Sequence, residues 1–141
     1  MILLFLAALV GLAWVDIRRQ QIPLEPVLVL LVLGLMGRAI ISDAPNAFFG
    51  MLIALGFFGA QYLFSKGKWI GDGDIWLGMA MGAWLGWQGM LVALYATYVG
   101  GGILALILLV LGVWKRGQRL PFVPFLALGA IAAVAVGWWR V

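Results

Sequence analysis

The segment GDGDIWLGMAMGAWLGW, residues 71–87, places two aspartates directly in front of a long apolar run. Asp74 stands at the start of that run, and another aspartate, Asp16, stands at the end of the apolar run that opens the chain. A carboxylate at the edge of a bilayer core is energetically costly. If the apolar segments cross the membrane in alternate directions, both carboxylates lie on the same side of it. Two such acids together indicate paired acid–base chemistry rather than structure.

The composition around these acids is typical of a protein that crosses a membrane. Of the 141 residues, 66% are hydrophobic and 10% are charged, whereas a soluble domain is about half apolar and about one-quarter charged. We therefore expect an integral membrane protein, with residues 1–141 forming a single domain. Cysteine and histidine are both absent, which excludes disulfides, thiolate nucleophiles, the Ser-His-Asp triad and the usual zinc sites. We expect no metal and no cofactor.

Six apolar runs are long enough, or nearly so, for a membrane helix, which needs roughly 20 residues. The runs are Ile2 to about Val15, Leu24 to Ile41, Ala47 to Phe64, Ile75 to Trp87, Met90 to Trp114 and Phe122 to Trp139. The predicted fold class is all-α, a polytopic membrane protein with six transmembrane helices. The first run has no basic region before it and no small-residue cleavage site after it, so we interpret it as a retained span rather than a signal peptide.

The positive charges predict the orientation of these spans. Seven of the nine basic residues lie in the loops after the first, third and fifth runs: Arg18, Arg19, Lys66, Lys68, Lys115, Arg116 and Arg119. The positive-inside rule assigns these loops to the cytoplasm. Both termini are then expected outside, with Asp16 and Asp74 at the cytoplasmic face of the cell membrane. We interpret the basic loops as orientation signals rather than as a nucleic-acid-binding surface.

Small residues at helical spacing predict close packing of helices. Stripes of this kind let helix backbones approach one another in a bilayer, although many membrane helices carry them. A contact between the first and fourth runs would bring the two aspartates together. Glycines 100–102 indicate a bend or another close crossing. The stripes consist of Gly78, Gly82 and Gly86 on the fourth run and of Ala7 and Gly11 on the first.

Two neighbouring carboxylates can hydrolyse a peptide bond without a metal, a histidine or a covalent intermediate. Repulsion and desolvation keep one proton on the pair, so one carboxylate activates water as a base while the other acts as the acid. Gly71 and Gly73 are expected to adopt backbone conformations that other residues avoid and to leave room for a peptide. The helix dipole favours a carboxylate at the position of Asp74.

Each acid also has a purely structural interpretation. Asp74 could cap the helix that it begins. Asp16 could form an interfacial ion pair with Arg19, which lies one helical turn away. Asp72 is expected to be a solvated loop residue. The catalytic interpretation fails only if the helix cap fully explains Asp74 and the ion pair fully explains Asp16.

Four segments together resemble the type IV prepilin peptidases and the related archaeal preflagellin peptidases, which are membrane aspartyl proteases with a G-x-G-D motif. The segments are Asp16 with Ile22-Pro23, Gly71 to Leu77, Gly82 to Gly86, and Leu120 to Gly129. The resemblance implies an aspartic endopeptidase that removes the basic leader of a prepilin or preflagellin-like protein, just before its apolar helix, at the cytoplasmic membrane face.

The resemblance also implies roles for individual residues. Asp16 and Asp74 match the two catalytic aspartates, and the supporting positions are Gly71, Gly73, Pro23, Pro121 and Pro124. The last two prolines fit breaks at a helix start, or they shape a gap through which an extended substrate reaches the aspartates. Two positions depart from the family pattern, since Leu24 replaces a common Asn and Trp76 a common Lys.

Larger members of the family carry an N-terminal region, often with cysteines, that is linked to N-methylation. This chain begins at the protease core, so we predict a compact peptidase without methyltransferase activity, similar to those that serve tight-adherence or archaeal-type pili. The alternatives are a small proton- or cation-coupled transporter that uses the same acids, and a non-catalytic member of the fold. The expected partners are the prepilin-like substrate and the lipid bilayer, and no nucleic acid.

Overall fold

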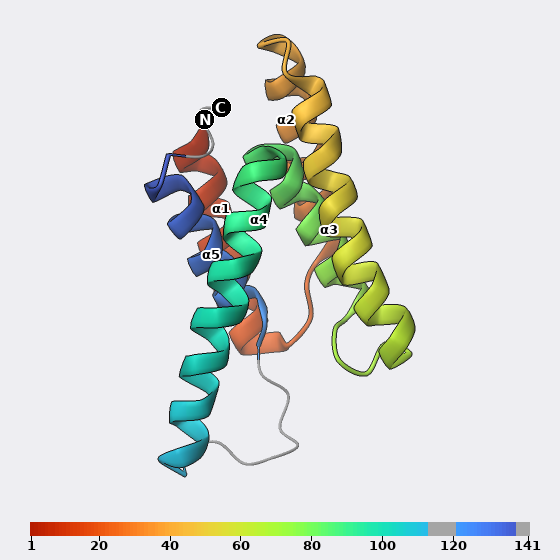
Figure 1. The fold of residues 1–141 in the computed structure, drawn as a ribbon. Helices are drawn as coiled ribbons and strands as arrows, with labels where there is room; N and C mark the ends of the chain where they lie inside the picture. Colours follow the sequence, from red (N-terminus) through yellow and green to blue (C-terminus); the bar gives the residue numbers. More distant parts are fainter. Residues whose placement is uncertain (113–120, 138–141) are drawn as a thin grey trace.

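The structure is a computed structural model that describes residues 1–112 and 121–137, and every regular element within these residues is a helix. The helices are α1 (Ile2–Arg19), α2 (Leu24–Ile40), α3 (Ala44–Ser65), α4 (Asp72–Val110) and α5 (Val123–Ala135) (Figure 1). The all-α expectation is confirmed. Lys115, Arg116, Arg119, Leu120 and the end of the sixth run lie outside the described residues.

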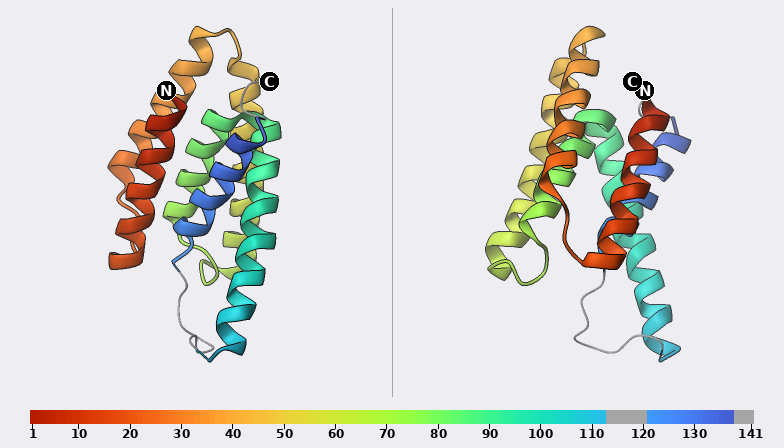
Figure 2. Two further views of the ribbon diagram at one scale, coloured as in Figure 1. Left: turned by 90° about the vertical axis from the view of Figure 1, so that its left-hand side faces the viewer. Right: turned by 180° about the vertical axis from the view of Figure 1, so that it is seen from behind.

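Helix α4 contains the fourth predicted span and the fifth up to Val110, and the expected end of the fifth at Trp114 lies outside the described residues. The helix is interrupted at Gly86, whose φ of 73° and ψ of 179° are essentially restricted to glycine. The chain reverses direction within α4, as Figures 1 and 2 show. We call residues 72–85 the first arm of α4 and residues 87–110 the second arm. A reversal here was expected from the sequence, but with a short linker up to Met90 instead of a break at one residue.

A polar cluster from α2 and α3 holds this break. Asn46 Oδ1 accepts the N–H of Trp87 at 2.9 Å, which supplies a partner for a donor that is unpaired at the start of a helical segment. The Asn46 amide donates to Asp43 at 3.1 Å, and Asp43 forms an ion pair with Arg38. Arg38 also donates to the carbonyl of Trp84 at 2.9 Å. The buried guanidinium therefore ties α2 and α3 to the first arm.

The glycine stripe of the first arm packs against α3. A Cβ atom on Gly82 would collide with the backbone of Gly50, and one on Gly78 would collide with the ring of Phe58. The two backbones are thus as close as the absence of side chains allows. The stripe indicated a close crossing correctly, but the neighbouring helix is α3 and not α1.

Helix α1 packs mainly against α5. Its contact with the first arm includes stacked rings of Phe5 and Trp84, whose centroids are 5.1 Å apart. Ala7 and Gly11 are exposed, and nothing lies within 4 Å of a Cβ placed on Gly11. This second stripe therefore does not pack closely against the first arm, because small-residue spacing marks a helix face without identifying its neighbour.

The second arm crosses α5 closely. A Cβ on Gly101 would lie 3.0 Å from the ring of Phe125, and one on Gly129 would collide with Thr97. The arm stays helical through residues 100–102, so the run forms no bend, and Gly101 alone of the three lies at a close crossing. Two helices in the described residues, α3 and α4, meet the length and apolarity of a membrane span. The structure thus confirms an apolar helical fold but not six separate transmembrane helices.

Candidate functional site

One end of the fold contains a partly open cavity of about 800 Å³. Three parts of the chain line it: the end of α1 with the following loop, the α3–α4 loop with the start of α4, and the segment before α5. The lining consists of Asp16, residues 20–22, residues 67–74 and residues 121–122. Both predicted catalytic aspartates therefore lie at the same cavity, although 57 positions separate them in the sequence.

Asp16 lies in the last turn of α1 and is 7% exposed. Its Oδ2 atom accepts the N–H of Val123 at 3.1 Å. Val123 is the first residue of α5, where backbone N–H groups have no partner within the helix and the dipole favours a negative charge. Among the described residues, no ion pair joins Asp16 to Arg19. The structural interpretation of Asp16 as an interfacial ion pair is therefore wrong.

Asp74 lies in the first turn of α4 and is also 7% exposed. Its Oδ2 atom accepts the N–H of Gly71 at 3.0 Å, which confirms that it caps its own helix. The cap does not remove Asp74 from the cavity, so capping and chemistry are compatible. Asp72 is exposed and accepts the N–H of the adjacent Gly73 at 3.0 Å, as expected for a solvated residue.

Neither motif glycine has an unusual backbone angle, and only Gly73 lies in a tight space. Gly71 has φ −81° and ψ 162°, which any residue can adopt. Gly73 is not among the described residues with positive φ. The expectation of forbidden conformations is therefore wrong. A Cβ on Gly73 would lie 3.0 Å from the Ile22 side chain, which shows how tightly the α1–α2 loop packs against the start of α4.

The prolines sit at helix starts. Pro23 directly precedes α2 with φ −67°, and Pro124 lies in the first turn of α5, where the lack of an N–H is tolerated. Pro121 is the proline that lines the cavity. The two departures from the family pattern, Leu24 and Trp76, are 45% and 40% exposed and do not line the cavity.

Sequence reasoning missed several parts of this site. It did not identify the N–H of Val123 as the anchor of Asp16, although Pro124 marks a helix start and hence free N–H groups. It also missed the contribution of residues 67–70 and of Phe122, which carry no recognisable catalytic pattern. No group of three or more acidic side chains that could hold a metal ion occurs within the described parts of the chain.

An apolar all-helical chain with two buried carboxylates at one cavity has the features of a membrane-bound acid–base site. The profile described as "Type IV leader peptidase family" matches residues 3–106, and the chain belongs to this family.

Curated relatives carry the name "Prepilin leader peptidase/N-methyltransferase". The chain is 30% identical to the protein from Legionella pneumophila, 31% to that from Aeromonas salmonicida and 33% to that from Pseudomonas aeruginosa, in each case over 96% of its own length. These alignments cover 49%, 48% and 49% of the relatives, so the chain spans about half their length. No solved structure matches the chain significantly.

Proposed function

We propose that this chain is a membrane aspartic endopeptidase that cleaves the leader from prepilin-like proteins. The observation that carries the proposal is that Asp16 and Asp74, from different helices, are both buried at one cavity of about 800 Å³. Membership of the leader peptidase family supports the same reaction.

The two carboxylates act as a pair on one water molecule. The ionised member removes a proton from the water as it attacks the carbonyl carbon of the scissile bond, and the protonated member donates to the carbonyl oxygen. Collapse of the tetrahedral intermediate then breaks the C–N bond, and a proton passes to the leaving amine. The N–H of Val123 orients Asp16, and the N–H of Gly71 orients Asp74.

In this proposal the chain crosses the cell membrane several times, and the site faces the cytoplasm. Arg18, Arg19, Lys66 and Lys68 lie at the cavity end, at or just after the ends of α1 and α3, and the positive-inside rule favours this end as cytoplasmic. Both termini would then lie outside. The substrate would be a prepilin or preflagellin-like protein whose basic leader lies in the cytoplasm and whose apolar helix lies in the bilayer.

Coexpression with a prepilin-type substrate tests the assignment. We expect Asp16→Asn and Asp74→Asn each to lower the cleavage rate by at least roughly 100-fold, the range for loss of a general acid or base. Asp72→Asn is the matched control, because it removes the same charge from the same motif and should retain cleavage. Full cleavage by either of the first two variants would refute the pair.

Two further measurements separate the alternatives. A parent protein that cleaves no prepilin, while proton or cation flux depends on Asp16 and Asp74, would identify a transporter. We propose hydrolysis without methyl transfer, since the acids at the cavity account for hydrolysis alone. Mass spectrometry of the cleaved product should show a free amino terminus, and a product methylated by this chain would contradict this part of the proposal.

A further inference from the structure

A polar pair bridges α3 and the second arm of α4 beside the cavity. The hydroxyl of Tyr98 donates to Oε1 of Gln61 at 2.9 Å. The ring of Phe57 lies edge-on to Tyr98, with centroids 5.0 Å apart. Tyr98 and Gln61 are both partly accessible from outside the protein. Together with the bond from the Trp87 N–H to Asn46 at the break, this hydrogen bond gives α3 and the second arm a polar contact.

This bridge lies at the depth of Asp74. Asp74 comes 12 residues before Gly86 and Tyr98 comes 12 residues after it. The two arms run in opposite directions from the break (Figure 1), and a helix rises about 1.5 Å per residue. Both residues are therefore about 18 Å from the break along their arms.

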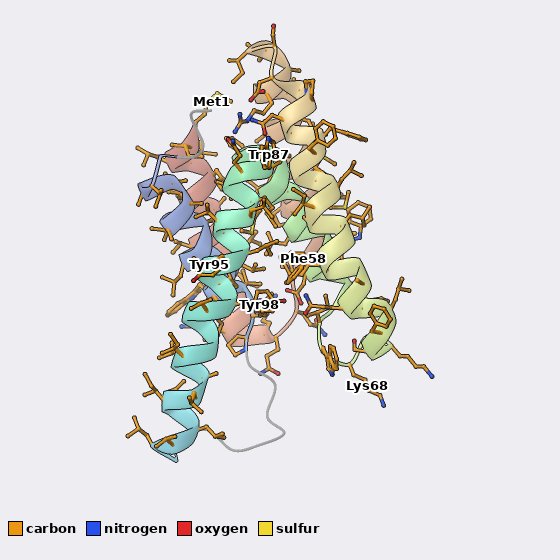
Figure 3. All side chains as sticks on the ribbon, viewed as in Figure 1. Met1, Phe58, Lys68, Trp87, Tyr95 and Tyr98 are labelled. Atoms are coloured by element: carbon orange, nitrogen blue, oxygen red, sulfur yellow. The ribbon has the colours of Figure 1, made fainter. Side chains whose placement is uncertain are left out.

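Aromatic rings connect the bridge to the cavity. Phe122 lines the cavity, and its ring packs against Tyr98, with centroids 5.7 Å apart, and against Phe58, at 6.2 Å. Figure 3 shows Phe58 and Tyr98 near one another between α3 and the second arm. The side chain of Phe122 thus contacts both the cavity and the bridge.

The other sides near this depth are closed more tightly. The first arm meets α3 at Gly78, where a Cβ would collide with the ring of Phe58, and the second arm meets α5 at Gly129 with no room for a side chain. Ile22 fills the space over Gly73. In contrast, α3 and the second arm diverge from the Gly86 end toward the cavity end (Figures 1 and 2). Here they meet through side chains, which can move without displacing a helix.

We propose that the Gln61–Tyr98 bridge is a lateral entrance through which the apolar helix of a membrane-spanning substrate approaches the aspartates. The inference rests on the proposed function. A substrate whose scissile bond directly precedes an apolar helix must bring that helix alongside the cavity without removing it from lipid. Separation of Gln61 and Tyr98 exposes Phe122 as an apolar wall. It also frees Oε1 of Gln61 to accept a backbone N–H from the extended segment before the helix, while the Gln61 amide nitrogen keeps its bond to the Phe57 carbonyl.

The absence of cysteine from the chain permits a direct test. The double variant Gln61→Cys, Tyr98→Cys is joined in membranes by a reducible bifunctional thiol reagent. Cleavage is measured for a membrane-spanning prepilin-type substrate and for a soluble peptide that has the same scissile sequence but lacks the apolar helix. Each single cysteine variant, treated with the same reagent, is the matched control.

We expect the crosslink to lower cleavage of the membrane-spanning substrate by roughly tenfold or more, as for closure of a gating element. Cleavage of the soluble peptide should persist. Reduction of the crosslink should restore cleavage of the membrane-spanning substrate. A crosslink that blocks both substrates or neither overturns the entrance while leaving the proposed function intact. An uncrosslinked parent that cleaves neither substrate overturns the proposed function itself.

A milder change gives a second readout. Tyr98→Phe removes the hydroxyl and keeps the ring, so the entrance should open more readily. We expect kcat/KM for the membrane-spanning substrate to rise roughly threefold, the typical effect of one hydrogen bond between membrane helices, with no change for the soluble peptide. A fall for both substrates would indicate a structural role only and would overturn the inference.

Discussion

Replacement of Gly86 by alanine tests the break that divides α4 into two arms. At φ 73° and ψ 179° a residue with a side chain is strained, which costs about 1–3 kcal/mol. The new Cβ would also collide with the Asn46 side chain. Moving Asn46 breaks its 2.9 Å bond with the N–H of Trp87, a loss of about 1 kcal/mol. We expect the free energy of unfolding to fall by about 2–4 kcal/mol.

Equilibrium unfolding in detergent micelles measures this effect. Gly100→Ala is the matched control, because Gly100 lies in the helical second arm with nothing within 4 Å of its Cβ position. That variant should be unchanged or stabilised by up to about 1 kcal/mol. Adding Asn46→Ala to Gly86→Ala should recover part of the loss by removing the collision. Equal stability of the Gly86 and Gly100 variants would refute the break at Gly86.

Three other predictions follow from the packing and the chemistry. Gly82→Ala should destabilise the protein by about 1–3 kcal/mol in the same assay, because its Cβ meets the α3 backbone; a neutral result would contradict the close crossing. Gly73→Ala should reduce cleavage, and a second change, Ile22→Ala, should restore it by removing the 3.0 Å contact; no rescue would argue against a steric cause. A rate profile across pH should decline on the alkaline side, where both aspartates are ionised and no shared proton remains, whereas a flat profile would exclude the pair.

The sequence predicted helix positions well because apolar runs and their breakers are local signals. Helices α2 and α3 begin within three residues of the expected positions and end within one, and the first arm of α4 begins within three. Helix α1 continues to Arg19, about four residues beyond the expected end, so Asp16 is a helical residue. Hydropathy marks where an apolar run stops, but a helix can continue through the polar residues that follow.

Partners across space were harder to predict than positions along the chain. The stripe of Gly78 and Gly82 indicated a close crossing, but spacing could not tell that α3 was the neighbour. The motif that contains Gly71 and Gly73 suggested special backbone angles. In the structure, Gly73 instead leaves space for the Ile22 side chain. The N–H of Val123 could not be assigned from side chains, since a backbone donor has no residue signature. These features depend on tertiary contacts that no local pattern encodes.

The central claim is that Asp16 and Asp74 work as one unit, and the rate of the doubly substituted enzyme tests it most directly. Cleavage of a membrane-spanning prepilin-type substrate is compared among the parent, Asp16→Asn, Asp74→Asn and the double variant, with Asp72→Asn as control. Groups that act together show strongly non-additive losses. We predict that the double variant is no slower than either single variant. Losses that multiply, or a single variant that retains the parent rate, would contradict the paired mechanism.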